Sequence, residues 1–280
     1  MTHSRLIFLK LGGSLITDKT QPMTPRPETL QRLAQEIAEV VSAEEPNLRL
    51  LIGHGSGSFG HEVAGRFQTQ LGGEGAAYWQ GFYKVWSAAR ALNQIVLNAF
   101  THAGLPVIAF PPSAGVISQN QHIIQWDTRP IAQALAHGLI PVVNGDVIFD
   151  IELGGTILST EALFLHLAKV FQPQQILIAG LEAGVYRHPQ QPQDIIPLIT
   201  PENLPEFLPS LAPSSAVDVT GGMLAKVKSM LSLVAELPGL EVHIFSGVQP
   251  GNLRKALTGV GESSGTLITN QTGRKSQIAG

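Results

Sequence analysis

Residues Leu50 to His61 read LLIGHGSGSFGH, an apolar run followed by a glycine cluster with a histidine at each end. The apolar part is typical of a buried strand, whereas four glycines within eight residues weaken regular structure. Such a cluster directly after a strand indicates that another group must come close to the backbone. Because exposed N–H groups in turns of this kind form concave anion sites, the stretch suggests phosphate binding.

The rest of the chain alternates apolar, strand-like runs with segments of helical periodicity. Strands are expected near 6–11, 49–52, 105–110, 139–143, 175–179, 242–245 and 265–268, and helices near 27–43, 76–103, 128–137, 161–170, 222–237 and 252–258. Residues 187–213, rich in proline and glutamine, are expected to form an irregular lobe. The alternation predicts an α/β fold with a mostly parallel sheet covered on both faces. Ligands of such sheets bind beyond the carboxyl ends of the strands, where the glycine clusters fall.

The composition narrows the class of protein. Charged residues make up only 14% of the 280 residues, against about 25% in typical soluble domains, which favours extensive buried surface, including a subunit interface. A net charge of -3 argues against a nucleic-acid partner. The absence of cysteine excludes disulfides, thiolate catalysis and cysteine-bound zinc. No signal peptide or membrane-spanning run is recognised, so we expect a cytoplasmic protein without a membrane partner.

Common phosphate-binding motifs fit the glycine cluster poorly. Gly55, Gly57 and Gly60 satisfy G-x-G-x-x-G, but no strand ending in an acidic residue follows about 20 residues later. The segment also resembles the glycine loop of protein kinases, but Val63 lies one position later than the valine of that motif. The chain contains neither of the other kinase motifs, H-R-D and D-F-G. A Walker A sequence is also absent.

Lysines near two further glycine pairs favour polyphosphate chemistry. Lys10 lies inside an apolar strand, where an ammonium group is costly unless it meets an anion. It precedes Gly12-Gly13-Ser14, and Lys19 follows five residues after the serine. In the second case Gly221 and Gly222 open an expected helix, with Lys226 about one turn inside it. The structural alternatives are a tight turn at the first glycine pair and a solvated lysine face on the helix after the second. The positive charges of these lysines are those that phosphoryl transfer requires.

These segments together resemble the amino acid kinase superfamily, and within it the members that phosphorylate isopentenyl phosphate. The resemblance rests on KLGGSLITDK at 10–19, the glycine cluster at 53–61, NGDV at 144–147 and DVTGGMLAK at 218–226. They occur in the order of the family and spread over nearly the whole chain. His61, after Ser-Phe-Gly, is the most discriminating position, because members whose acceptor is a phosphate or phosphonate carry a histidine there.

The resemblance implies a three-layer αβα sandwich with a mostly parallel central sheet. It implies a single domain over 1–280, with an acceptor-binding lobe at about 1–172, a nucleotide-binding lobe at about 173–270 and a polar tail at 271–280. The implied activity is ATP-dependent phosphorylation of isopentenyl phosphate to isopentenyl diphosphate, with Mg²⁺ accompanying the ATP. No metal-binding side chain is assigned, and a homodimer is expected.

Roles can be carried over residue by residue. The implied catalytic residues are Lys10, Lys19, His61 and Lys226. The implied ATP contacts are Lys10, Gly12, Gly13, Ser14, Gly57, Gly222 and Lys226. The implied contacts of the acceptor phosphate are Ser56, His61 and Gly145.

Two segments depart from the pattern of the family. Where the family often has Ser-Gly-Asp-Asp, this chain has Ser-Thr-Glu-Ala at 159–162, so that Glu161 is the one remaining carboxylate. The Thr-Asp-Val-Asp-Gly-Val of the family becomes GLEAGV at 180–185. Both changes border the implied nucleotide site. They leave the nucleotide preference and the role of Glu161 open.

An isoprenoid acceptor also requires an apolar channel. The long helix expected after His61 carries a cluster of five aromatic residues: Tyr78, Trp79, Phe82, Tyr83 and Trp86. These residues either pack in the core or at a dimer interface, or they line this channel. Two other functions stay open. One is a kinase of another small phosphate or phosphonate, such as fosfomycin, and the other is a non-catalytic nucleotide-binding sensor.

Overall fold

The computed structural model of the protein describes residues 4–44, 47–188, 191, 194–208, 222–259 and 265–271. Residues 218–221 of the lysine-containing segment and nearly all of the expected polar tail therefore lie outside the described residues, as do parts of 187–213. The side chain of His61 also lies outside what is described.

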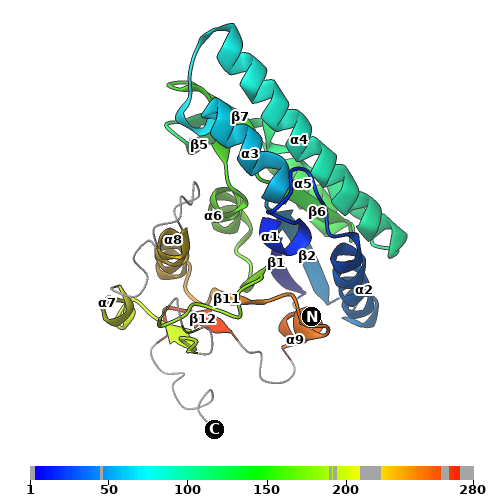
Figure 1. The fold of residues 1–280 in the computed structure, drawn as a ribbon. Coiled ribbons are helices and arrows are strands. Elements are labelled where there is room, and N and C mark those ends of the chain that lie inside the picture. Colours follow the sequence, from blue (N-terminus) through cyan, green and yellow to red (C-terminus); the bar gives the residue numbers. More distant parts are fainter. Residues whose placement is uncertain are drawn as a thin grey trace.

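The centre of the fold is an eight-stranded sheet, drawn in Figure 1. In spatial order its strands are β10 (Leu198–Ile199), β12 (Thr266–Ile268), β11 (Glu241–Ser246), β9 (Gln175–Gly180), β1 (Arg5–Leu11), β2 (Leu48–His54), β6 (Ile140–Asn144) and β3 (Val107–Ala109). Among the strands that the structure describes, only β11 and β12 pair antiparallel in this sheet. The predicted mostly parallel sheet is confirmed.

Helices cover both faces of this sheet (Figure 1). One face carries α5 (Arg129–Ala136), α6 (Thr160–Phe171) and α8 (Gly222–Glu236), and the other carries α2 (Pro27–Glu44), α4 (Gly75–His102) and α9 (Asn252–Thr258). Successive side chains of a strand point to opposite faces. In β1, Phe8 packs among residues of α6 and α8, whereas Ile7 and Leu9 pack among those of α2 and α4. Lys10 has the parity of Phe8 and therefore faces α6 and α8.

A second, four-stranded sheet was not predicted from the sequence. Its order is β5 (His122–Trp126), β4 (Val116–Gln119), β7 (Asp146–Asp150) and β8 (Gly154–Leu158). These strands have four or five residues each, and only Gly145 separates β7 from β6. Asn120 and Gln121 turn β4 into β5 with positive φ angles of 47° and 65°. An Asn-Gln turn is a weaker hairpin signal than Asn-Gly, so the pattern resembled a loop.

Short helices follow the glycine clusters directly. Helix α1 (Gly13–Ile16) begins after β1, and α3 (Gly57–Phe67) begins three residues after β2. The remaining elements are the 3₁₀ helices η1 (Thr69–Leu71) and η2 (Pro112–Ala114) and the helix α7 (Leu204–Phe207). Glycine has low helix propensity, so α3 was not predicted.

Candidate active site

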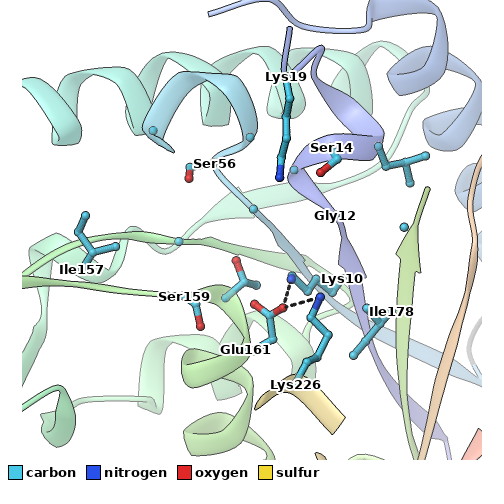
Figure 2. A pocket seen from close by; sticks show the side chains of 18 of the residues that line it. Lys10, Gly12, Ser14, Lys19, Ser56, Ile157, Ser159, Glu161, Ile178 and Lys226 are labelled. Carbon is cyan, nitrogen blue, oxygen red and sulfur yellow. Dashed lines mark hydrogen bonds and ion pairs between the residues drawn. The ribbon is translucent and has the colours of Figure 1, made fainter. Parts of the chain in front are cut away.

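A cavity of about 270 Å³ lies at the carboxyl ends of β1, β2, β6 and β9 (Figure 2). Nine of the residues assigned through the resemblance line it: Lys10, Gly12, Gly13, Ser14, Lys19, Ser56, Gly57, Gly145 and Lys226. Gly222 opens α8 with a φ of 67°, one residue before Met223, which lines the cavity. His61 lies in α3, one turn after Gly57.

The two glycine loops pack against each other at the mouth of the cavity. A side chain on Gly13 would come within 2.7 Å of the Gly57 Cα, and Gly57 has a left-handed φ of 49°. Thr17 joins the loops, because its hydroxyl donates to the Gly13 carbonyl (2.7 Å) and accepts from the Ser58 N–H (2.9 Å). Close backbone approach is therefore the reason for glycine at these positions.

Helix α3 points its N-terminus toward the cavity. It begins at Gly57, and its N-cap residue Ser56 makes no side-chain capping hydrogen bond. Both residues line the cavity, so the positive end of the helix dipole faces the enclosed space. An anion bound there would interact favourably with the first turn of α3.

A carboxylate joins two of the lysines on the opposite side of the cavity. The Glu161 carboxylate accepts a hydrogen bond from the ammonium of Lys10, and Lys226 Nζ lies 3.6 Å from the same Oε1 atom (Figure 2). Burial lowers the pKa of Lys10, and Lys226 and Lys19 add to the lowering, whereas Glu161 opposes it. Burial alone would raise the pKa of Glu161, but Lys10 and Lys226 hold it well below its usual range.

Lys19 approaches from the loop after α1, and Figure 2 shows its amine pointing inward near Ser14. Three ammonium groups therefore share the cavity, while Glu161 supplies one negative charge among them. The contacts with two lysines also explain the role of Glu161, which stands where the family often has the shorter aspartate. The sequence singled out the residue but gave no means of finding its partners.

Hydrogen bonds of His54 connect the elements that form the cavity wall. Its carbonyl accepts from the Thr160 hydroxyl (2.6 Å) and the Gly145 N–H (3.2 Å), which ties β2 to α6 and to the β6–β7 junction. The imidazole contacts the Gly55 carbonyl (3.1 Å) and Asn93 of α4 (3.0 Å). Burial lowers the pKa of His54, so the ring is neutral at pH 7. Sequence reasoning missed Thr160 and Asn93.

Asp146 is a second buried carboxyl group in the cavity wall. It accepts from the Ser113 hydroxyl (2.7 Å) and from the Val147 N–H (2.8 Å). Burial raises the pKa of Asp146 to about 6, although both hydrogen bonds oppose the rise. The group therefore titrates close to neutral pH.

The other end of the cavity is apolar, with Ile157 on the side away from Lys226 in Figure 2. Small aliphatic side chains line this end: Ala64, Val85, Ala89, Ile157 and Leu158. None of the five aromatic residues of the expected cluster is among the described lining residues. Phe82 packs in one cluster with Val85 and Ile157, so it supports the apolar wall without lining the cavity.

The described residues contain no group of three or more acidic, histidine or cysteine side chains able to hold a metal ion. Glu161 is occupied by two lysines, which leaves it a poor cation ligand. The lining residues instead suit a Mg²⁺ ion held mainly by substrate phosphates, its common mode in kinases. Within the same part of the chain, no helix has the length and apolarity needed to cross a membrane.

Comparison with known proteins shows similarity along nearly the whole chain. The model of the amino acid kinase family matches residues 5–246. Isopentenyl phosphate kinase of Methanothermobacter thermautotrophicus is 33% identical over 275 residues, which cover 95% of this chain and 100% of the relative. The corresponding protein of Methanocaldococcus jannaschii is 30% identical over 268 residues, covering 94% and 98%. A solved structure described as "X-ray structures of isopentenyl phosphate kinase" gives a TM-score of 0.79 at 30% identity, covering 95% and 100% of the two chains.

Proposed function

Because this chain belongs to the amino acid kinase family, we propose that it transfers the γ-phosphoryl group of ATP to the phosphate of isopentenyl phosphate. One observation carries the proposal: a single cavity combines lysines and glycine loops with an aliphatic wall that includes Ala64, Val85 and Ile157. This combination suits an acceptor with an anionic head and a short apolar tail. The named relatives phosphorylate the same kind of molecule.

The reaction requires little acid–base catalysis. A phosphate monoester is largely dianionic near neutral pH, since its second pKa is about 6. One of its oxygens attacks the γ-phosphorus, the bond to the β–γ bridging oxygen breaks, and ADP leaves. The main difficulty is to bring two anions together and to stabilise the charge of the transferring group.

The lysines answer this difficulty. Lys10 and Lys226 would hold the ATP phosphates, and Lys19, from the opposite side, would stabilise the transition state. Glu161 has a positioning role, because its contacts with Lys10 and Lys226 fix the two ammonium groups. Its charge also favours the protonated form of the buried Lys10, since it opposes the lowering of the Lys10 pKa by burial.

The glycine loops would bind the phosphate groups of both substrates. The ATP phosphates would contact the backbone or hydroxyl groups of Gly12, Gly13, Ser14, Gly57 and Gly222. The acceptor phosphate would lie against Ser56, Gly145 and His61, with its tail directed toward Ile157. In this arrangement residues 1–172 would hold the acceptor and 173–270 the nucleotide, whose phosphates would also reach the glycine loops of the first lobe. Mg²⁺ bound to the ATP phosphates would neutralise part of their charge. A homodimer and a cytoplasmic location stay predictions.

A coupled assay of ADP release tests the proposal with three acceptors: isopentenyl phosphate, dimethylallyl phosphate and fosfomycin. We expect turnover of both prenyl phosphates, and a loss of about 10²-fold or more in Lys10→Met. Turnover of fosfomycin alone would identify a phosphonate kinase instead. ATP binding without turnover of any acceptor would identify a nucleotide sensor.

A further inference from the structure

The imidazole of His54 lies between two hydrogen-bond partners beside the glycine cluster. Its Nδ1 atom is 3.1 Å from the Gly55 carbonyl oxygen, and its Nε2 atom is 3.0 Å from Oδ1 of Asn93 in α4. Both His54 and Asn93 are buried. The ring is neutral at pH 7 because burial lowers its pKa. A neutral imidazole carries one proton, so it donates through one nitrogen and accepts through the other.

The Gly55 carbonyl decides which nitrogen of His54 carries the proton. A carbonyl oxygen can only accept, so the bond to Gly55 requires the proton on Nδ1. Nε2 then needs a donor, which Asn93 supplies when its amide nitrogen faces the ring. A half-turn about the last bond of the side chain exchanges the oxygen and nitrogen of an amide. Only the tautomer with the proton on Nδ1 therefore satisfies both contacts.

The first turn of α3 has N–H groups that are available to a ligand. The Ser58 N–H donates to the Thr17 hydroxyl (2.9 Å), and the Phe59 N–H donates to the Ser56 carbonyl (3.1 Å). No described residue accepts a hydrogen bond from the N–H of Ser56 or Gly57. Both of these residues line the cavity. Because the free N–H groups of a helix point out of its N-terminus, they suit a phosphate oxygen.

The Gly55 carbonyl and the Ser56 N–H belong to one planar peptide, in which they point in opposite directions. A hydrogen bond to the carbonyl therefore also sets the direction of the N–H. On the basis of the function proposed above, we infer that His54 and Asn93 form a positioning pair for the acceptor phosphate. Asn93 keeps the proton of His54 on Nδ1, and the bond from Nδ1 to Gly55 keeps the Ser56 N–H directed at the phosphate. Neither side chain touches the reacting atoms.

The pair connects the two parts of the acceptor site. Val85, Ala89 and Asn93 follow one another at intervals of four residues, so they lie on one side of α4. Val85 and Ala89 belong to the apolar wall of the cavity, and Asn93 reaches the glycine cluster through His54. The structural alternative is a ring that only fills space between β2 and α4. Any side chain of similar size would then replace it.

Two substitutions of His54 separate these explanations. Counted in bonds from Cα, the amide nitrogen of Asn lies as far out as Nδ1, and that of Gln as far out as Nε2. His54→Asn therefore keeps a donor for Gly55, whereas His54→Gln loses it and keeps the contact with Asn93. We expect His54→Gln to lower kcat/KM for isopentenyl phosphate about 10²-fold, and His54→Asn no more than about 10-fold. Gln is closer to His in size, so a space-filling role predicts the opposite order.

The matched control is His102→Gln. His102 is exposed on α4, where its Nδ1 atom lies 2.6 Å from the Asn98 carbonyl oxygen, so the same change is made outside the cavity. It should leave kcat/KM unchanged. A loss in His54→Asn that equals or exceeds the loss in His54→Gln would overturn the inference.

Long-range ¹H–¹⁵N NMR of the unliganded wild-type protein measures the tautomer directly, with the ring of His54 assigned through its backbone resonances. We expect the proton on Nδ1. A proton on Nε2, alone or together with one on Nδ1, would overturn the inference. This result needs no turnover, and it decides even if neither variant of His54 folds. Absence of turnover of isopentenyl phosphate by the wild-type protein would instead contradict the proposed function, so the two failures are distinguishable.

Discussion

The charged groups of Lys10 and Glu161 contact each other, although 151 residues separate them in the chain. Lys10 belongs to β1 and faces α6 because it has the parity of Phe8, whose side chain packs on that face. Glu161 lies in the first turn of α6, and Lys226 reaches the same carboxylate from α8. One side chain thus sets the positions of ammonium groups from two other elements.

Glu161→Gln should reduce the rate and change its dependence on pH. Without the carboxylate, burial and the neighbouring lysines would lower the pKa of Lys10 further. Lys10 would then lose its proton at a lower pH, so the alkaline limb of the kcat/KM profile should move to lower pH. We expect kcat to fall about 10²-fold.

Glu161→Asp keeps the charge, so it should restore the shape of the profile while leaving a reduced rate. Glu236→Gln is the control, because Glu236 forms an exposed ion pair with Lys169 (2.7 Å) away from the cavity. A wild-type pH profile in Glu161→Gln would show that the contact has no role in keeping Lys10 charged.

Lys19→Ala should reduce kcat with little effect on folding. Lys19 is exposed and points into the cavity, so its removal leaves the core intact. Loss of one preorganised charge at a transferring group costs about 10²- to 10³-fold in kcat. Steady-state kinetics and a melting curve measure both effects. Lys255→Ala, at an exposed position of α9, should change neither; a Lys19→Ala enzyme as fast as wild type would remove Lys19 from the mechanism.

Gly57→Ala should destabilise the protein by about 1–3 kcal/mol, because a residue with a side chain is strained at a left-handed φ of 49°. The added Cβ would also overlap the Thr17 hydroxyl that joins the two glycine loops. Urea denaturation measures the loss. Gly65→Ala on the same helix has no atom within 4 Å of the new Cβ, so it should be neutral or stabilising by about 0.5–1 kcal/mol. Equal effects of the two substitutions would contradict the packing described for the loops.

Asp146→Asn should stabilise the unliganded protein in a way that depends on pH. The pKa of Asp146 in the folded protein is about 6, against about 3.9 in the unfolded chain. Ionisation between these values opposes folding, so wild type should lose stability relative to Asp146→Asn as pH rises from 4 to 6.5. The difference should not exceed about 3 kcal/mol.

The measurement is the free energy of unfolding of both proteins at several pH values. Asp127→Asn is the control, since Asp127 is exposed and pairs with Arg129. A stability difference between wild type and Asp146→Asn that stays constant across this range would show that Asp146 has an ordinary pKa.

The central sheet was predictable because its elements have clear periodicity. The apolar run ending at Leu11 and the helical spacing from Pro27 gave strand and helix within one residue of the observed bounds. The small sheet was not predictable, because β7 and β8 are short and the turn at Asn120 lacks glycine. Without that sheet, the apolar wall at Ile157 could not be placed, and the sequence left open whether the aromatic cluster of α4 packs the core or a dimer interface, or lines the channel.

The site was predictable where a motif marks it and unpredictable where the fold creates it. Glycine pairs and the lysine at position 10 were visible in the chain. The joining of Lys10 and Lys226 by Glu161 depends on the relative placement of β1, α6 and α8.

Phosphorus NMR of isopentenyl phosphate mixed with MgATP and the protein measures the proposed reaction most directly. We expect the singlet of the monoester to disappear while the coupled doublets of an alkenyl diphosphate and the signals of ADP grow in equal amounts. With Lys10→Met the same conversion should be at least about 10²-fold slower. A monoester singlet that persists while ATP is consumed, or that converts equally fast with Lys10→Met, would contradict the proposed function.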